Sequence, residues 1–290
     1  MQGKTGCVIL NYNDADTTQS LIEKIKDYSS INNIVIVDNE STDDSFQRLL
    51  TLANEKIYVI KSEKNGGYGY GNNIGVEYAY TILRCEFVLI ANPDVIFAND
   101  TIKNMVDYMS MNEFVGVIAP RQLDICGNVI RDVAWKIPTI FQYIVSSEYF
   151  IGKYSLQFHY SPTYFSEKKP YIVDAVPGSF LLVRGEAFHK SGGYDPEMFL
   201  YCEETTLGQK MKNLHYLTVL LNNEEYVHHH SVSINKSIKG LYKQRKILLN
   251  SRYVFLKKYL HANIFQLFWA RFFFAISSAE NVIIQMVKNI

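Results

Sequence analysis

A carboxylate, Asp94, directly follows a run of apolar residues and a proline in the segment Asn92-Pro93-Asp94. The apolar residues 87–90 are typical of a buried strand in a parallel sheet. Because proline has no N–H to donate, the strand must end at Pro93, which places Asp94 at the carboxyl edge of the sheet. Open α/β sheets bind ligands at that edge, and a carboxylate there suits a hard cation such as Mg²⁺ or Mn²⁺. The alternative interpretation is a simple turn.

Two adjacent carboxylates, Glu203 and Glu204, follow the apolar residues 198–202 and begin a predicted helix. Helix N-termini favour carboxylates, so the pair could serve only to cap the helix. The pair could also supply a general base, which must lie within hydrogen-bond reach of the proton that it removes. Both interpretations stay open at this point.

Three consecutive histidines, His228, His229 and His230, follow Tyr226 and Val227. Side chains alternate between the two faces of a strand, so His228 and His230 are predicted to share one face. Neutral imidazole is a common metal ligand, and one of these residues could therefore bind a metal.

Polar residues also follow two earlier predicted strands. Asn11 follows the apolar residues 7–10, and Asp38 and Asn39 follow the apolar residues 34–37. Parallel strands end at one edge of a sheet, so these groups are expected to converge, which favours a binding site over unrelated turns. Asp38 and Asn39 are suited to hydrogen-bond a nucleobase or ribose, and the alternative is that the segment only caps the next helix.

The glycine-rich segment 65–75 precedes another predicted helix and contains Asn65, Gly67 and Asn72. No frame in it satisfies the G-x-G-x-x-G fingerprint of dinucleotide-binding proteins, and it follows the third strand instead of the first. A nicotinamide-dependent oxidoreductase is therefore disfavoured. Glycines before a helix still allow the backbone to approach a phosphate or sugar closely, and a flexible turn is the alternative.

The elements that must position these residues alternate between strand and helix along the first half of the chain. Strands are predicted at residues 7–10, 34–37, 57–60, 87–90 and 115–124, and helices at about 16–28, 41–53 and up to 84. Repeated strand-helix units indicate right-handed crossovers and a parallel, doubly wound sheet. Further strands are predicted at 171–174 and 180–183. Between them, the aromatic side chains of residues 127–170 could stack on a sugar or form a satellite core.

The composition is that of a soluble globular protein, with 290 residues, 48% hydrophobic and 20% charged. The four scattered cysteines and the absence of a signal-peptide pattern predict a cytoplasmic protein with reduced thiols. Residues 231–290 contain ten lysines and arginines but one acidic residue, although the formal net charge of the chain is zero. A basic tail on an acidic body indicates an anionic surface as partner, and no nucleic-acid partner is predicted.

In this order and spacing, the segments resemble the family 2 inverting glycosyltransferases, which have the nucleotide-sugar-binding fold called GT-A. The resemblance covers about residues 5–235 and is carried by segments 8–12, 37–43, 65–67, 71–75, 92–95, 177–184, 192–195 and 199–204 and by His228. It implies an α/β fold with a mostly parallel central sheet flanked by helices, plus C-terminal helices. Residues 1–235 would form the catalytic domain, with a nucleotide-sugar-binding half to about residue 124 and an acceptor and catalytic half at 125–235.

The resemblance also implies roles for the polar strand ends. Asp94 stands where the second carboxylate of the family's Asp-x-Asp motif binds the metal, Asn92 replaces the first, and His228 matches a late histidine that completes the metal shell. Asp38 stands where the family contacts the base of the nucleotide. The donor-binding residues implied in this way are Asn11, Asp38, Asn39, Asn65, Gly67, Asn72 and Asn92.

Glu203 and Glu204 stand at a Glu-Asp pair of the family whose second member deprotonates the acceptor hydroxyl. The second member here is glutamate, so Glu204 is the expected base and Glu203 the alternative. The family's Asp-x-Asp-Leu continuation is replaced by Thr205-Thr206-Leu207. This departure supports a rival prediction, a non-catalytic nucleotide- or sugar-binding protein on a degenerate transferase scaffold.

The activity implied by the resemblance is the metal-dependent transfer of a sugar, with inversion, to a hydroxyl of a glycan or a lipid-linked saccharide. The Asn-Pro-Asp-Val form at 92–95 is most similar to the rhamnosyltransferase-like branch, so the expected donor is dTDP-L-rhamnose or a UDP-sugar. The expected process is the synthesis of a cell-surface polysaccharide.

The basic tail, residues 236–290, is predicted to form amphipathic helices. Charged and polar residues such as Arg271 and Glu280 interrupt its apolar stretch, which disfavours a membrane span. A helix in the membrane interface, with Trp269 dipped in and basic residues at the headgroups, would place the protein at the inner face of the cell membrane. The alternative is that the helices pack on the catalytic domain or form a homodimer contact.

Overall fold

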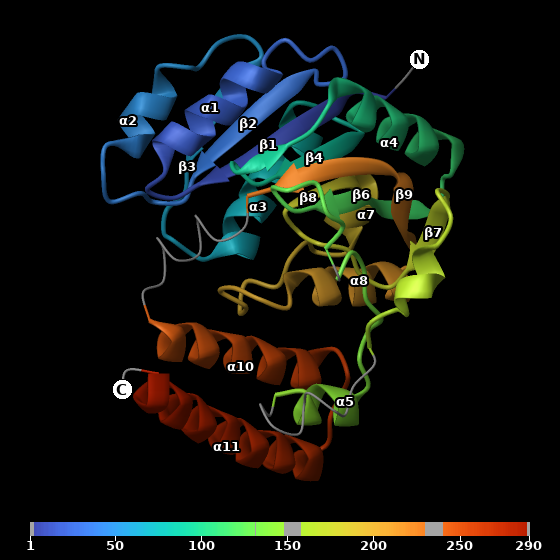
Figure 1. Ribbon diagram of the computed structural model, residues 1–290. Helices are drawn as coiled ribbons and strands as arrows, with labels where there is room; N and C mark the ends of the chain where they lie inside the picture. Colours follow the sequence, from blue (N-terminus) through green and yellow to red (C-terminus); the bar gives the residue numbers. More distant parts are fainter. Residues whose placement is uncertain (1–2, 131, 148–157, 230–239, 289–290) are drawn as a thin grey trace.

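The computed structural model describes residues 3–288 except 131, 148–157 and 230–239. They form a central β-sheet with helices on both faces, and a separate group of helices lies beyond one of those faces (Figure 1). The strands are β1 (Thr5–Asn11), β2 (Asn33–Asp38), β3 (Ile57–Lys61), β4 (Phe87–Ala91), β5 (Val95–Ile96), β6 (Val115–Leu123), β7 (Pro170–Val173), β8 (Phe180–Arg184) and β9 (Leu217–His228).

The sheet has the order β3-β2-β1-β4-β8-β6-β9-β5, and β7 pairs with β9. The pairs β2–β3, β1–β2, β1–β4 and β6–β9 are parallel, which confirms the mostly parallel sheet expected from the strand-helix alternation. Among these strands, β2 and β4 are buried along their whole length, as expected for strands covered on both faces.

Three strands depart from a uniformly parallel sheet. β8 is antiparallel to both β4 and β6, and β5 and β7 are antiparallel to β9. The reversed direction of β8 brings the residues before it to the edge where β4 ends, so the N–H of Asn92 donates to the carbonyl of Ser179 at 2.8 Å. An antiparallel strand therefore carries residues 177–179 to the binding edge.

Two hydrophobic cores hold the helices on the sheet. One face packs against α1 (Ala15–Ile25), α2 (Ser45–Leu50) and α4 (Asn99–Met111). The other packs against α3 (Tyr68–Glu77), its π-helical continuation (Tyr78–Ile82), α7 (Gly185–Lys190) and α8 (Glu203–Asn213). The sequence analysis did not predict α4, although its buried residues Ile102, Met105, Val106 and Met109 have helical spacing.

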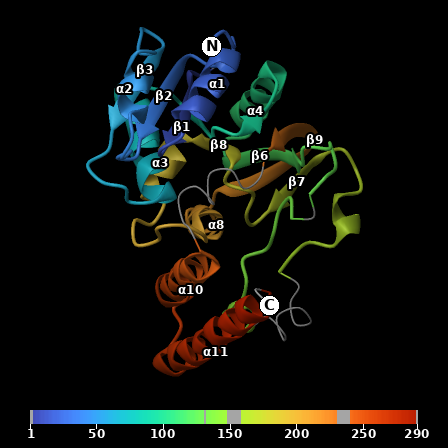
Figure 2. The same cartoon turned by 60° about the vertical axis from the view of Figure 1, so that its left-hand side comes forward.

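The C-terminal helices α10 (Leu241–Lys258) and α11 (Ile264–Lys288) pack on each other and on α5 (Ile140–Val145). They lie beyond α8 (Figure 2). Their shared core includes Phe255, Leu256 and Phe274, and it also contains Met198 and Cys202 from the segment before α8. An ion pair between Lys258 and Asp195 at 3.1 Å joins α10 to the same segment. The tail is thus packed against the rest of the chain, while the boundary expected at residues 235–236 lies outside the described residues.

None of the helices in the described part of the chain is both long and apolar enough to cross a bilayer. The outer side of α11 nevertheless exposes a series of large apolar side chains. Phe265 is 76% exposed, Phe268 65% and Trp269 52%, and Ile264, Phe272 and Ile276 are also exposed. Because the spacing is helical, these residues form one surface, here called the α11 stripe.

Candidate active site

A cavity of about 460 Å³ lies at the carboxyl edge of β1, β2 and β4. Its wall includes the residues that follow these strands, residues 177–179 before β8, the start of α8 and one side of α10. The convergence of polar strand ends predicted from the sequence is therefore present for Asn39, Asn92 and Asp94, which all line this cavity. Glu203, Glu204 and His228 line it as well.

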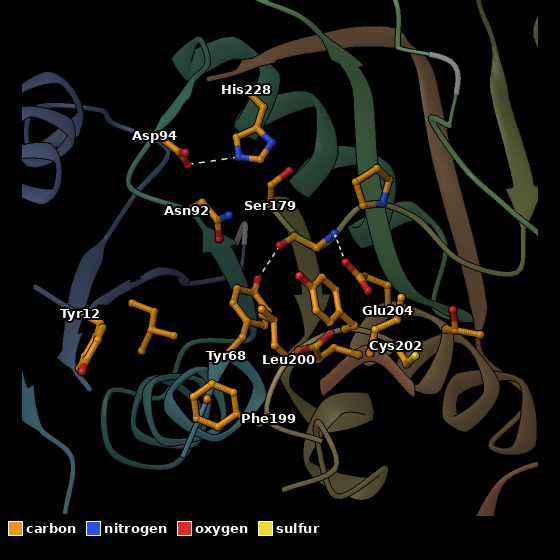
Figure 3. A pocket seen from close by; sticks show the side chains of 18 of the residues that line it. Tyr12, Tyr68, Asn92, Asp94, Ser179, Phe199, Leu200, Cys202, Glu204 and His228 are labelled. Carbon is orange, nitrogen blue, oxygen red and sulfur yellow. Dashed lines mark hydrogen bonds and ion pairs between the residues drawn. The ribbon is translucent and has the colours of Figure 1, made fainter. Parts of the chain in front are cut away.

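Asp94 and His228 form a buried pair at one end of the cavity (Figure 3). Asp94 Oδ1 and His228 Nε2 lie 3.2 Å apart, and each residue is 8% exposed. The pair forms because β5 aligns Val95 with His228 in the antiparallel ladder with β9. His229 donates its backbone N–H to the carbonyl of Asp94, and His230 lies outside the described residues.

A chain of buried polar groups holds His228 from behind. Gln122 Nε2 lies 3.3 Å from His228 Nδ1, and the Tyr226 hydroxyl donates to Gln122 Oε1 at 2.8 Å. The Ser179 and Tyr226 hydroxyls are hydrogen-bonded at 2.8 Å. Contacts of this kind fix the ring orientation of a histidine ligand. Gln122, Ser179 and Tyr226 were not predicted as site residues. Gln122 and Ser179 lie 106 and 49 positions before His228 in the sequence, so no local pattern connects them with it.

The opposite wall is formed by Asn39, Asn65 and Gly67. Asn39 Nδ2 donates to Asn65 Oδ1 at 3.0 Å and to the carbonyl of Gly67 at 3.1 Å. Gly67 has φ +91°, and a Cβ there would lie 1.9 Å from the carbonyl oxygen of Phe199. Glycine is required here because the conformation is left-handed and the backbone of Phe199 approaches it closely.

Three predicted donor-binding residues do not line the cavity. Asn11 and Asp38 are fully buried, and the Asp38 carboxylate accepts from Asn11 Nδ2 at 2.9 Å and from the Ser41 hydroxyl at 2.6 Å. Asn72 is 1% exposed and donates to the carbonyl of Tyr68. Asn11 and Asp38 thus bond to each other across β1 and β2, and Asn72 bonds within its own helix. The contact with a nucleotide implied for Asp38 would require its present partners to give way.

Glu203 and Glu204 begin α8 and face the cavity from the side of residues 177–179. Glu204 Oε1 accepts from the Gly178 N–H at 3.4 Å (Figure 3). Glu203 is 3% exposed, and its Oε1 has no hydrogen-bond partner. Burial, reinforced by the neighbouring Glu204, raises the pKa of Glu203 well above its usual value. Burial also raises the pKa of Glu204, although hydrogen bonds from backbone N–H groups oppose this shift.

The two residues before the carboxylates have left-handed backbones. Tyr201 has φ +73° and Cys202 φ +69°, a conformation that costs about 1–2 kcal/mol for a non-glycine residue. The Ser251 hydroxyl of α10 donates to the carbonyl of Leu200 at 2.8 Å, and the Tyr143 hydroxyl donates to Cys202 Sγ. Burial raises the pKa of the Cys202 thiol to about 12, so it stays protonated and unreactive. Strained backbone of this kind is typical of functional sites.

The aromatic segment 127–170 contributes side chains both to the cavity wall and to a cluster of aromatic rings. Trp135, Tyr143 and Phe158 line the cavity, and Trp135 Nε1 donates to Thr205 Oγ1 at 3.0 Å. Tyr160, Phe165 and their aromatic neighbours instead pack on one another beside β7 and against the core on that face of the sheet. Arg252 of α10 also lines the cavity and was not predicted as a site residue. Its position in the sequence showed only that it belongs to a basic helix.

Within the described residues, no group of three or more His, Cys, Asp or Glu side chains could hold a metal on its own. Asp94 and His228 provide one carboxylate and one imidazole on the cavity wall, and both are ligand types that Mn²⁺ accepts. The pair fits a metal whose other ligands come from a bound diphosphate and water, as is usual for Mg²⁺ with phosphate substrates.

Comparison with known proteins identifies the class. Residues 7–185 match the family described as glycosyl transferase family 2, and the chain belongs to this family. Among solved structures, it is similar to GalNAc-T7 with UDP, GalNAc and Mn²⁺, with a TM-score of 0.61, 14% identity and coverage of 89% of this chain and 50% of that one. It is also similar to a mannosyltransferase from Pyrobaculum calidifontis in complex with GDP-Man and Mn²⁺, with a TM-score of 0.58, 14% identity and coverage of 97% and 76%. These likenesses confirm the GT-A fold.

The similar curated proteins are transferases of a narrower kind. The chain is 26% identical over 233 residues to rhamnosyltransferase WbbL of Escherichia coli, covering 77% of this chain and 83% of that protein. It is 25% identical to N-acetylglucosaminyl-diphospho-decaprenol L-rhamnosyltransferase of Mycobacterium tuberculosis, covering 70% and 68%. A third relative is the low-salt glycan biosynthesis hexosyltransferase Agl10 of Haloferax volcanii, 27% identical over 68% of this chain but only 58% of its own length. The chain is therefore a rhamnosyltransferase-like member of the family.

Proposed function

We propose that this protein transfers a sugar from a nucleoside-diphosphate donor to a hydroxyl of a glycan or lipid-linked saccharide, with inversion at the anomeric carbon. The observation that carries the proposal is the placement of the Asp94–His228 pair and the Glu203–Glu204 pair on the wall of one cavity. The rhamnosyltransferase names of two relatives support dTDP-L-rhamnose as donor, and a UDP-sugar is the second choice.

Asp94 and His228 would hold Mg²⁺ or Mn²⁺ against the donor diphosphate. The metal would supply positive charge that stabilises the leaving diphosphate. Ligation by His228 Nε2 needs the ring proton on Nδ1, and an amide flip of Gln122 would let its oxygen accept that proton. Asn39, Asn65 and the backbone at Gly67 would bind the nucleotide end of the donor.

Glu204 would remove the proton from the acceptor hydroxyl. The hydroxyl oxygen forms a bond to the anomeric carbon as the bond from that carbon to the diphosphate oxygen breaks, and the proton passes to Glu204. A carboxylate with a raised pKa is a stronger base than an ordinary glutamate. One displacement without a covalent intermediate inverts the configuration, by the logic that separates inverting from retaining glycosidases.

The C-terminal helices would bring the site to a membrane surface. The α11 stripe places aromatic side chains outward, and the described part of the tail is rich in Lys and Arg, a combination suited to an anionic interface. This location, at the inner face of the cell membrane, would suit a lipid-linked acceptor in the synthesis of a surface polysaccharide. The alternative occupant of the stripe is a second copy of the chain in a homodimer.

A thermal-shift screen of nucleotide sugars, with Mn²⁺ or Mg²⁺ and with EDTA, tests the proposal. A true donor binds the folded state and raises Tm by mass action, and its hydrolysis or transfer is then followed by release of the nucleoside diphosphate. Stabilisation that needs the metal, together with turnover, is the expected result. Stabilisation without turnover on any acceptor would favour the non-catalytic binding protein, which the altered Thr205-Thr206 segment supports.

A further inference from the structure

The end of the cavity near Glu204 is formed partly by α10. Leu248 and Arg252 of this helix line the cavity beside Tyr143 and Cys202. Arg252 is the only lysine or arginine among the described residues that line it. Among the lining residues that the structure describes, the one permanent positive charge thus comes from a helix outside the sequence region matched to the family.

The Arg252 guanidinium has few partners of its own. Nη1 donates to the Ser146 hydroxyl at 3.2 Å, and the group lies over the Tyr143 ring, 5.0 Å from its centroid. Nε is buried and has no hydrogen-bond partner. Among the described residues, no carboxylate forms an ion pair with Arg252, whereas Lys258 of the same helix is paired with both Asp195 and Glu197.

A half-buried guanidinium without a counter-ion is costly, because desolvation of the charge is not compensated. It offers several N–H donors in a planar arrangement that matches phosphate and carboxylate oxygens. The contacts with the Tyr143 ring and the Ser146 hydroxyl restrict the group, so less conformational freedom is lost when an anion binds. The site is therefore prepared for an anion that the chain itself does not provide.

Two observations place this anion with the acceptor. The contacts with Tyr143 tie Arg252 to Cys202, which directly precedes the carboxylates that face the acceptor. Figure 3 shows Cys202 and Glu204 on one side of the cavity, away from Asp94 and His228, where the donor diphosphate is expected. Two buried carboxylates would also repel an anionic acceptor, and the Arg252 guanidinium on the same cavity wall supplies charge of the opposite sign.

We propose that Arg252 forms an anion subsite for the acceptor, so that the preferred acceptor carries a phosphate or carboxylate near the reacting sugar. The inference rests on the proposed glycosyl transfer and adds the chemical class of the acceptor. A phosphate would come from a lipid diphosphate linked to the sugar, and a carboxylate would come from an acidic sugar. In both cases the planar donors of Arg252 bind the anion while Glu204 faces the hydroxyl.

Binding of small probes separates these sources without requiring turnover. Geranyl diphosphate, octyl glucuronide and the neutral octyl glucoside are titrated calorimetrically into the full-length protein in EDTA, so that no divalent cation offers a second anion site. Arg252→Gln removes the charge, Arg252→Lys keeps the charge but not the planar donors, and the exposed Lys257→Gln is the matched control on the same helix. Tm and nucleotide affinity with Mn²⁺ are measured for every variant.

The wild type is expected to bind one anionic probe more tightly than octyl glucoside. Arg252→Gln should lower the affinity for that probe by about 10- to 100-fold, as expected for the loss of hydrogen bonds from a charged group. The affinity should fall less in Arg252→Lys and should not change in Lys257→Gln. The probe that responds identifies the phosphate or the carboxylate source. Equal binding of all three probes by the wild type, or equal losses in Arg252→Gln and Lys257→Gln, would overturn the subsite. Failure of nucleotides to bind with Mn²⁺ would instead count against the proposed transfer.

Discussion

Asp94 and His228 lie 134 residues apart in the sequence, yet their side chains meet at 3.2 Å across the cavity wall. The contact depends on a two-residue strand, β5, which starts next to Asp94 and pairs Val95 with His228. A backbone ladder therefore sets the distance between a carboxylate and an imidazole on the cavity wall.

Replacing Asp94 by alanine should abolish metal-dependent nucleotide binding and leave the fold intact. The reason is that Asp94 contributes a carboxylate to the cavity wall and does not belong to the hydrophobic core. Calorimetry with UDP and dTDP, in Mn²⁺ and in EDTA, measures the effect. Asp27→Ala removes an exposed carboxylate on the other side of the sheet and should change nothing. Nucleotide affinity in Mn²⁺ that survives Asp94→Ala would show that the metal, if bound, is held elsewhere.

Replacing Glu204 by glutamine should reduce turnover by about 10²–10⁴, because the shape is kept and the proton acceptor is lost. Donor affinity should stay close to that of the wild type. Glu203→Gln is the comparison, since Glu203 has the same side chain one position earlier but is more deeply buried. A large loss in Glu203→Gln and a small loss in Glu204→Gln would reverse the assignment of the base.

The raised pKa of Glu203 predicts a pH-dependent stability. The pKa of this carboxyl is higher in the folded protein than its value of 4.5 in the unfolded chain. Below pH 4.5 the carboxyl is protonated in both states and does not lower the stability of the protein. Stability is lost as the pH rises through the folded pKa. The Tm of Glu203→Gln relative to wild type should therefore improve between pH 5 and pH 8, where a gain of about 1 kcal/mol would appear as about 2–4 °C. A Tm difference that is constant over this range would mean that ionisation of Glu203 does not lower the stability of the folded protein.

Gly67→Ala should be more damaging than Gly127→Ala, although both glycines have positive φ. An added Cβ at Gly67 would collide with the carbonyl of Phe199, whereas nothing lies within 4 Å of one at Gly127. Gly127→Ala is expected to lower the free energy of unfolding by about 1–2 kcal/mol. Gly67→Ala should lower it by more than this and should also weaken nucleotide binding. Urea unfolding and calorimetry give both values. Equal costs at the two positions would show that the contact with Phe199 can relax freely.

The α11 stripe should bind anionic liposomes, and binding should weaken at high salt because screening reduces the attraction of basic residues to headgroups. The double variant Phe268→Ser/Trp269→Ser should lower the sedimented fraction by about 10-fold or more, since two exposed aromatic side chains lose their burial in lipid. Phe114→Ser, an exposed phenylalanine before β6, is the control.

Removal of residues 263–290 gives a second measurement for the same surface, although it also uncovers the core around Phe274. Full-length protein that ignores anionic liposomes at low salt, and changes its oligomeric state when Phe268 and Trp269 are replaced, would assign the stripe to a homodimer. Sedimentation velocity distinguishes this outcome from unfolding.

The sequence by itself determined the parallel half of the sheet and the edge at which the site lies. Apolar runs such as residues 34–37 and 87–90 specify buried strands, and Pro93 ends one of them at Asp94. These features are local, because strand burial and chain termination depend on a few consecutive residues. The same reasoning placed Glu203 and Glu204 at the start of a helix, where the structure has them.

Only the tertiary structure decided which polar groups reach the cavity. Asp38, like Asp94, lies at the carboxyl edge of the sheet, yet Asn11 and Ser41 enclose its carboxylate. Arg252 reaches the cavity because α10 packs on Tyr143, a contact across 109 positions of the sequence. Such contacts depend on how helices and strands pack, which is set by the whole hydrophobic core, so no local pattern could reveal them.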